Sequence, residues 1–156
     1  MNVIFTDVDG VLNNHKTTEH ISGYRGIELK KVKILKELCD KTDSKLVLSS
    51  SWRAHVRLND TFGKYLLRKF KAAGLEIYDR TPEIQWDRRE CEISEWLRGK
   101  KVEHIIILDD EDYYWRSNLN KFFIDTAAFG TIGNPFDGLT EEHITYILEH
   151  FDDYVM

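Results

Sequence analysis

The sequence has 156 residues, of which 42% are hydrophobic and 31% are charged, and its formal net charge is −5. This length and composition exclude a disordered chain and predict one folded domain over residues 1–156. The acidic balance argues against strong binding of duplex nucleic acid, which depends on Lys and Arg neutralising phosphates.

The predicted elements alternate between strands and helices. Short apolar runs predict buried strands, and apolar residues at helical spacing predict amphipathic helices. In chain order they are a strand at 2–6, a loop at 13–26, a helix at 28–40, a strand at 45–48, a helix from 58 to 73, a strand at 75–78, a helix at 90–98, strands at 102–108 and 122–124, and a last helix after Thr140 that extends to Phe151. This alternation predicts an α/β domain with a mainly parallel sheet.

The sequence also bears on location. No apolar run reaches the roughly 18–20 residues that cross a bilayer. The apolar start is broken by Asp7, so we expect neither a signal peptide nor a membrane partner. Cys39 and Cys91 have no CxxC spacing and indicate neither a disulfide framework nor a zinc site. These features predict a reducing, cytoplasmic compartment.

Three predicted strands end in polar clusters. These are Asp7 with Asp9, the run Ser49-Ser50-Ser51, and Asp109 with Asp110. Ligands of open α/β sheets bind outside the carboxyl ends of the strands, so the clusters should converge if the strands are neighbours. Close carboxylates need a cation or a shared proton, and Mg²⁺ prefers such hard oxygen ligands. Solvated acids in surface loops are the alternative interpretation.

The stretch Asp7-Val-Asp9-Gly10-Val11 resembles the first motif of the haloacid dehalogenase (HAD) superfamily, Asp-x-Asp-Gly-(Thr/Val). Three further motifs follow in that family: a strand-terminal Ser or Thr, a Lys or Arg, and a strand-terminal acidic pair. Candidates for all of them stand in the same order up to Asp110. The resemblance implies a Rossmann-like HAD fold, with helices on both faces of a mainly parallel sheet, and Mg²⁺ as the cofactor.

The resemblance also implies a division of labour between the first two acids. Asp7 is the nucleophile that forms an aspartyl-phosphate, and it lies at the metal. Asp9 protonates the leaving oxygen and then activates water, while its backbone carbonyl binds the metal. Ser49 is the favoured hydroxyl of the second motif, with Ser50 as the next candidate to bind the substrate. Turn or capping serines are the alternative.

The basic motif must precede the strand at 102–108, where Arg88 and Arg89 stand together. A cation there stabilises charge on the transferring phosphoryl group. We favour Arg89 as the catalytic residue and keep Arg88 as a substrate-binding candidate. Arg53 either binds phosphate through its planar fork or is a structural or solvated charge.

The acidic motif and the residues after it complete the candidate site. Asp110 is assigned to the metal, and Asp109 is assigned to holding the metal's ligand shell in place. The aromatic run at 113–115 either stacks on a base or packs over the edge of the sheet.

The spacing of the motifs leaves no room for a sizeable cap domain, since only about thirty-odd residues separate the first from the second. An open site suits terminal or macromolecular phosphates. The strings Leu48-Ser-Ser-Ser-Trp-Arg53 and Ile107-Leu-Asp-Asp110 resemble capless HAD domains of nucleic-acid end repair, such as the phosphatase half of polynucleotide kinase-phosphatase. This resemblance implies a phosphomonoesterase acting on phosphorylated nucleic-acid ends or nucleotides. A non-catalytic Mg²⁺-binding module and a metal-dependent nuclease are the alternatives.

Overall fold

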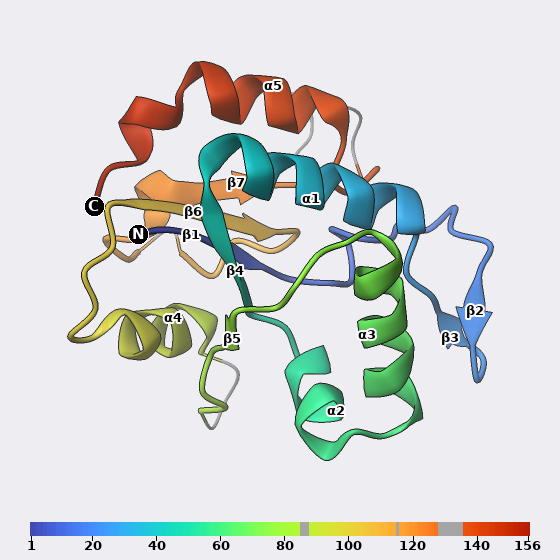
Figure 1. The fold of residues 1–156 in the computed structure, drawn as a ribbon. Helices are drawn as coiled ribbons and strands as arrows, with labels where there is room; N and C mark the ends of the chain where they lie inside the picture. Colours follow the sequence, from blue (N-terminus) through green and yellow to red (C-terminus); the bar gives the residue numbers. More distant parts are fainter. Residues whose placement is uncertain (85–87, 115, 128–135) are drawn as a thin grey trace.

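The computed structural model describes residues 1–84, 88–114, 116–127 and 136–156. In this part of the chain, a parallel sheet has the strand order β5-β4-β1-β6-β7 (Figure 1). Its strands are β1 (Asn2–Thr6), β4 (Ser44–Leu48), β5 (Asp79–Arg80), β6 (His104–Asp109) and β7 (Phe123–Asp125). The central strand β1 pairs with both β4 and β6, so that Ile4 lies opposite Leu46 on one side and Ile106 on the other. The predicted α/β class with a parallel sheet is therefore confirmed.

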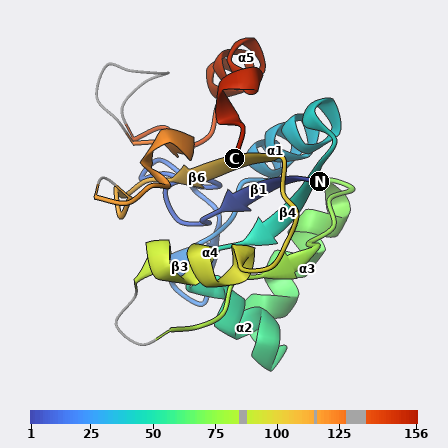
Figure 2. The same cartoon turned by 90° about the vertical axis from the view of Figure 1, so that its left-hand side faces the viewer.

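Helices cover both faces of this sheet, as the resemblance implied. The described helices are α1 (Leu29–Thr42), α2 (Trp52–Leu58), α3 (Thr61–Ala72), α4 (Arg89–Leu97), α5 (Glu141–Glu149) and the 3-10 turns η1 (Asn120–Phe122) and η2 (Phe151–Tyr154). Figures 1 and 2 show α1 and α5 on one face of the sheet and α4 on the other. Helix α3 packs against α1 and α2.

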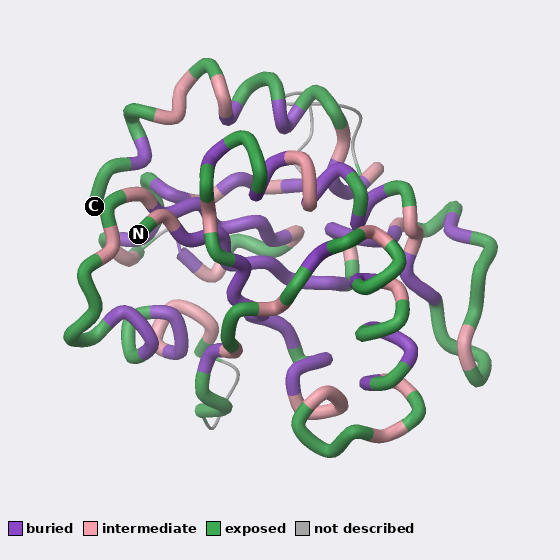
Figure 3. The backbone as a smooth tube through the Cα atoms, in the orientation of Figure 1, coloured by how far each residue is buried: buried purple, intermediate pink, exposed green. Residues whose placement is uncertain are grey.

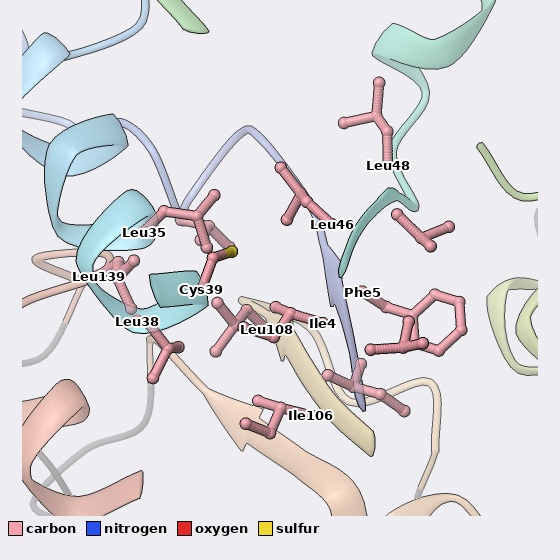
Figure 4. Close-up of a cluster of buried hydrophobic side chains, with 14 of the residues drawn as sticks. Ile4, Phe5, Leu35, Leu38, Cys39, Leu46, Leu48, Ile106, Leu108 and Leu139 are labelled. Atoms are coloured by element: carbon pink, nitrogen blue, oxygen red, sulfur yellow. The ribbon is translucent and has the colours of Figure 1, made fainter. Parts of the chain in front are cut away.

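The core lies on both faces of the central strands, which are the buried segments in Figure 3. Figure 4 shows Leu35 of α1 and Leu108 of β6 on one side of β1, and the Phe5 ring on the other. There the Phe5 ring meets the Trp96 ring of α4 edge to face, with the centroids 5.3 Å apart. Successive residues of a strand point to opposite faces, which is why a continuous apolar run can serve two layers of helices.

The helix predicted from 58 to 73 corresponds to α3, and its predicted start overlaps the last residue of α2, a helix that was not predicted. Asn59 ends α2 in the left-handed conformation, at φ 52°. Asp60 then caps α3, because its carboxylate accepts a hydrogen bond of 2.9 Å from the Gly63 N–H. Both residues are strong local signals for a helix boundary, but the apolar spacing continues across them and concealed the break. Gly74 follows the end of α3 at φ 73°, as predicted.

The strand predicted at 75–78 is wrong, because β5 begins only at Asp79. The Leu75 N–H donates to the Phe70 carbonyl at 2.9 Å, so this part of the chain still belongs to the turn that closes α3. The Tyr78 N–H then reaches the Leu46 carbonyl at 2.8 Å, and the parallel pairing with β4 follows at Asp79 and Arg80.

The segment predicted as a loop at 13–26 contains a short antiparallel hairpin. Its strands are β2 (His20–Ile21) and β3 (Tyr24–Arg25), and Figure 1 shows them projecting from the sheet next to α3. The two turn residues, Ser22 and Gly23, both have positive φ angles, 48° and 79°. Such a two-residue turn matches the twist of the flanking strands. Two-residue strands are too short to show a period of two in the sequence.

The two ends of the chain lie next to each other at the amino end of β6 (Figure 1). The Glu103 N–H donates to the Met1 carbonyl at 2.8 Å, and the Glu103 carbonyl accepts from the Met156 N–H at 2.9 Å. The candidate site is at the opposite, carboxyl edge of the strands. Among the described residues, no helix combines the length and the apolar composition needed to cross a membrane.

Candidate active site

Three carboxylates meet at the carboxyl edge of the two central strands. Asp7 follows β1, while Asp109 ends β6 and Asp110 follows it. One oxygen atom from each lies within 4.8 Å of the other two. Because β1 and β6 are neighbours in register, the two acidic motifs are brought together, as the sequence predicted. The Asp9 carboxylate is not part of this described group of three.

Gly10 is required at this edge because Asp110 lies directly against it. Its φ of 80° is in the left-handed region, and a Cβ atom built on it would lie 2.1 Å from Asp110 Oδ2. A side chain at this position would therefore displace the Asp110 carboxylate as well as strain the backbone. The Thr126 hydroxyl holds the Gly10 carbonyl with a hydrogen bond of 2.7 Å.

Arg89 supplies the cation of the cluster. Its Nη1 lies 3.1 Å from Asp109 Oδ2 and 3.6 Å from Asp7 Oδ1, and it also donates to the Ser49 carbonyl. The side chain of Arg88, by contrast, is 62% exposed and lies 3.6 Å from Glu90. The structure thus brings Arg89 to the carboxylates of Asp7 and Asp109 and directs Arg88 toward solvent.

Burial and mutual repulsion raise the pKa values of these acids, so that each binds a proton more readily than an exposed carboxylate does. Burial first, and then the charge of Asp7, raise the pKa of Asp109 to about 8. The same two causes raise the pKa of Asp110 to about 6. Burial also raises the pKa of Asp7, against the opposing effect of Arg89. Three crowded oxygen donors with this excess of negative charge fit a divalent cation such as Mg²⁺, which would replace the protons.

This electrostatic arrangement predicts how the stability of the metal-free protein depends on pH. The folded-state pKa values of Asp109 and Asp110 lie above the unfolded value of about 4. At these two residues the folded state binds more protons between about pH 4 and pH 8, so their contribution to the free energy of unfolding falls as the pH rises through that window. Buried His143, whose pKa is lowered to about 4 by burial and then by Lys31, has the opposite effect below about pH 6.5.

Thermal denaturation at about pH 5 and pH 8, with EDTA or with excess Mg²⁺, measures how the stability and its response to the metal depend on pH. We expect Mg²⁺ to raise the melting temperature more at pH 8, because the metal binds the deprotonated carboxylates. Comparing the two conditions at each pH cancels the contribution of His143. Asp110→Asn is the control, since it should reduce the Mg²⁺ effect at both pH values. An equal or larger Mg²⁺ effect at pH 5 would contradict the assignment of these carboxylates to a metal.

Asp9 is held beside the cluster by two side-chain donors. Its Oδ1 accepts a hydrogen bond of 2.8 Å from Asn13 Nδ2, and its Oδ2 accepts one of 3.0 Å from Trp52 Nε1. Asn13 is fully buried, donates also to the Gly26 carbonyl and accepts from the Gly10 N–H. Because both oxygens have donors, the Asp9 side chain has a fixed position at the exposed side of the site.

The hydroxyls of Ser49 and Ser50 lie in different environments. The Ser50 side chain acts to lower the pKa of Asp7, and its hydroxyl accepts a hydrogen bond of 3.2 Å from the Trp52 N–H. The Ser49 side chain is buried, and its hydroxyl has no hydrogen-bond partner among the described residues. The structure therefore places both serines at the site edge, and Ser50 is the one whose side chain influences the Asp7 carboxylate.

Arg53 lies below this edge in a buried ion pair. Its Nη2 is 2.6 Å from Glu92 of α4, and its Nη1 donates to the Ser50 carbonyl at 2.8 Å. Both side chains are at least nine-tenths buried. The pair ties the serine turn to the helix that begins with Arg89, which matches the structural alternative for this charge.

The aromatic run after the acidic motif packs at the sheet edge. Tyr114 is fully buried, and its hydroxyl donates to Asp109 Oδ2 at 3.0 Å. The Tyr113 ring lies under the Arg89 guanidinium, 5.3 Å from it. The third residue of the run, Trp115, lies outside the described residues.

Asn13 and Trp52 are the site residues that sequence reasoning missed. Asn13 stands at the start of a polar stretch that was predicted only as a loop. Trp52 follows the serine run directly, and a large aromatic residue immediately after a strand-terminal polar cluster was the available signal. Its partner Asp9 is 43 residues away in sequence, so only the fold reveals the contact.

The comparisons with known proteins agree with this geometry. Residues 3–144 match the family model described as the HAD domain in Swiss Army Knife RNA repair proteins. Searches of curated proteins and of solved structures gave no match. The matched region contains Asp7, Arg89 and Asp110, and the described chain between the first two motifs holds the small hairpin, α1 and β4, without a large cap. The chain belongs to the family of HAD domains of Swiss Army Knife RNA repair proteins.

Proposed function

We propose that this domain is a Mg²⁺-dependent phosphomonoesterase that acts through an aspartyl-phosphate on Asp7. Membership of the HAD family supports a phosphatase in general. The observation that carries the specific proposal is the position of Asp7, which lies beside the Arg89 cation and in one group with the carboxylates of Asp109 and Asp110. A nucleophilic carboxylate needs such positive charge beside it before a phosphate dianion can approach.

The proposed reaction has two steps that share the same residues. In the first, an Asp7 carboxylate oxygen attacks phosphorus, the bond to the leaving oxygen breaks, and Asp9 gives that oxygen its proton. In the second, Asp9 takes a proton from water, the water oxygen attacks phosphorus, and the bond to Asp7 breaks to release inorganic phosphate. The donors Asn13 and Trp52 keep Asp9 directed at the leaving group in both steps.

Asp7 and Asp110 would hold the Mg²⁺ ion, with Asp109 beside them and the Asp9 backbone carbonyl as a further ligand. When bound, the ion supplies Lewis-acid stabilisation of charge on the phosphoryl oxygens. The hydroxyl of Ser50 donates a hydrogen bond to one of those oxygens, with Ser49 as the neighbouring candidate. Arg89 balances the charge that remains on Asp7 and Asp109.

The proposed substrate is a phosphorylated nucleic-acid end or a nucleotide. The description of the family as domains of RNA repair proteins supports this class. The lack of a large cap among the described residues supports a terminal phosphate on a large molecule, because an open site can admit such a substrate. We also propose a cytoplasmic setting, which the free thiols of Cys39 and Cys91 favour.

A phosphate-release screen tests this proposal. The substrates are oligonucleotides with a 5′- or a 3′-phosphate, free nucleotides, phosphopeptides and sugar phosphates, each with Mg²⁺ or with EDTA. We expect Mg²⁺-dependent release of inorganic phosphate from the oligonucleotide ends, with the chain left intact. Internal cleavage of labelled oligonucleotides would indicate a nuclease, and Mg²⁺ binding without turnover would indicate a binding module. A preference for free sugar phosphates would contradict the open-site reasoning.

A further inference from the structure

A cavity of about 510 Å³ opens directly beside Asp9. Its lining consists of Asp9, Tyr24, Arg25, Ser51, Trp52, His55 and Phe62. Apart from Asp9 and the supporting role of Trp52, the proposed chemistry uses none of these residues. The lining comes from three separate parts of the chain: the β1 exit, the β2–β3 hairpin and the pair of helices α2 and α3.

The cavity is unusually aromatic for a site at the edge of a polar cluster. The Phe62 ring lies 5.7 Å from the Tyr24 ring, 6.1 Å from the Trp52 ring and 5.0 Å from the His55 ring, measured between centroids. Tyr24 is 68% exposed, which is far more than an aromatic side chain needs to be when its role is packing. The ring therefore presents a flat apolar surface at the mouth of the cavity.

Both walls of the cavity are fixed before any ligand arrives. On the hairpin side, the Gly26 N–H donates to the Glu19 carbonyl at 2.8 Å, and the Glu19 carboxylate contacts both the Tyr65 hydroxyl and Lys69 of α3. On the helical side, α2 and α3 approach so closely that a Cβ atom on Gly63 would lie 2.1 Å from the α2 backbone. A site with rigid walls loses little conformational entropy on binding.

We propose that this cavity binds the unpaired terminal base of the nucleotide whose phosphate is removed. The inference rests on the proposed function, because Asp9 protonates the leaving oxygen and the leaving nucleoside must therefore lie on the Asp9 side. A nucleobase stacks on aromatic side chains regardless of its identity. Arg25, the cation of the lining, is placed to meet the phosphate of the next nucleotide. A base that remains paired in a duplex cannot enter such a pocket.

The test compares pairs of trinucleotides that differ only in the terminal base. One member of each pair carries adenine on the phosphorylated nucleotide, and the other is abasic there; one pair has a 3′-phosphate and one has a 5′-phosphate. For the end that the enzyme uses, we expect kcat/KM to be about 5- to 100-fold higher with the base present, the range that one stacked base supplies.

Two variants test whether the cavity causes the difference in kcat/KM between base-carrying and abasic substrates. Tyr24→Ala should lower the ratio of the two kcat/KM values toward one, because it removes the exposed ring from the mouth. Tyr78→Ala is the matched control, since Tyr78 is 53% exposed and lies outside this cavity, and it should leave the ratio at the wild-type value.

The outcomes separate the inference from the proposed function. Equal hydrolysis of base-carrying and abasic substrates, or a ratio that Tyr24→Ala leaves unchanged, overturns the cavity inference while the phosphatase proposal stands. Release of phosphate from none of the four substrates contradicts the phosphatase proposal. In that case, binding of the same trinucleotides, followed by intrinsic tryptophan fluorescence, decides: tighter binding of the base-carrying member supports the cavity, and equal binding overturns it.

Discussion

Asp7→Asn is expected to lower phosphate release by about 10⁴-fold or more, the size of effect that follows removal of a catalytic nucleophile. The amide that replaces the carboxylate is a poor nucleophile but has almost the same shape. It can still accept the hydrogen bond of 2.8 Å that the Val8 N–H gives to Oδ1. The measurement is kcat with the best oligonucleotide substrate at saturating Mg²⁺.

The same variant should keep its fold, and without metal it should be at least as stable as the wild type. Burial raises the pKa of Asp7, so the native carboxylate is destabilised where it stands, and the neutral amide removes that cost. Thermal denaturation in EDTA at about pH 8 measures this. Asp40→Asn, an exposed acid that pairs with Lys36 on α1, is the matched control and should change neither quantity. A variant that retains most of its activity would exclude the covalent mechanism.

Replacing Arg89 by Met should reduce both activity and stability. Loss of a cation beside a transferring phosphoryl group costs about 10²- to 10³-fold in turnover. The change also leaves Asp7 and Asp109 without their buried partner, which costs up to about 3 kcal/mol of unfolding free energy. We expect the stability loss to be larger at high pH, because Arg89 stabilises the charged forms of these acids and those forms become more populated as the pH rises. The two measurements are kcat/KM and chemical denaturation at about pH 6 and pH 8.

Arg88→Met is a closely matched control. It also removes a guanidinium group, but the Arg88 side chain faces solvent instead of the carboxylates. It should alter the unfolding free energy by less than about 0.5 kcal/mol. If the two methionine variants behaved alike, Arg89 would not be the cation of the site.

The parts of the fold that were predictable are those with a strong local signal. β1, β4 and β6 are short apolar runs buried on both faces, and such runs have few other interpretations. The break between α2 and α3 and the start of β5 depend on which backbone groups find partners. The Leu75 N–H binds within the turn after α3 instead of joining the sheet, and no sequence period records that choice.

The candidate site shows a similar division. The carboxylates were found because acids directly after buried strands have a mechanistic reason to be there. The sequence could not decide between Arg88 and Arg89, because both have the same chemistry. The position of each on the helix determines which side chain faces inward. The role of Asn13 could not be predicted for another reason. Its burial results from contacts with Asp9 and the Gly26 carbonyl, which only the folded hairpin brings together.

The meeting of both chain ends on Glu103 has a practical consequence for work with this domain. Anything joined to Met1 or to Met156 departs from the amino edge of the sheet, a full strand length away from the carboxylates. A surface attachment or a fluorescent label placed at either end therefore leaves the edge that carries the candidate site uncovered. The ends are also close enough for a short peptide to join them, so the order of the elements can be permuted without stretching the chain across the catalytic edge.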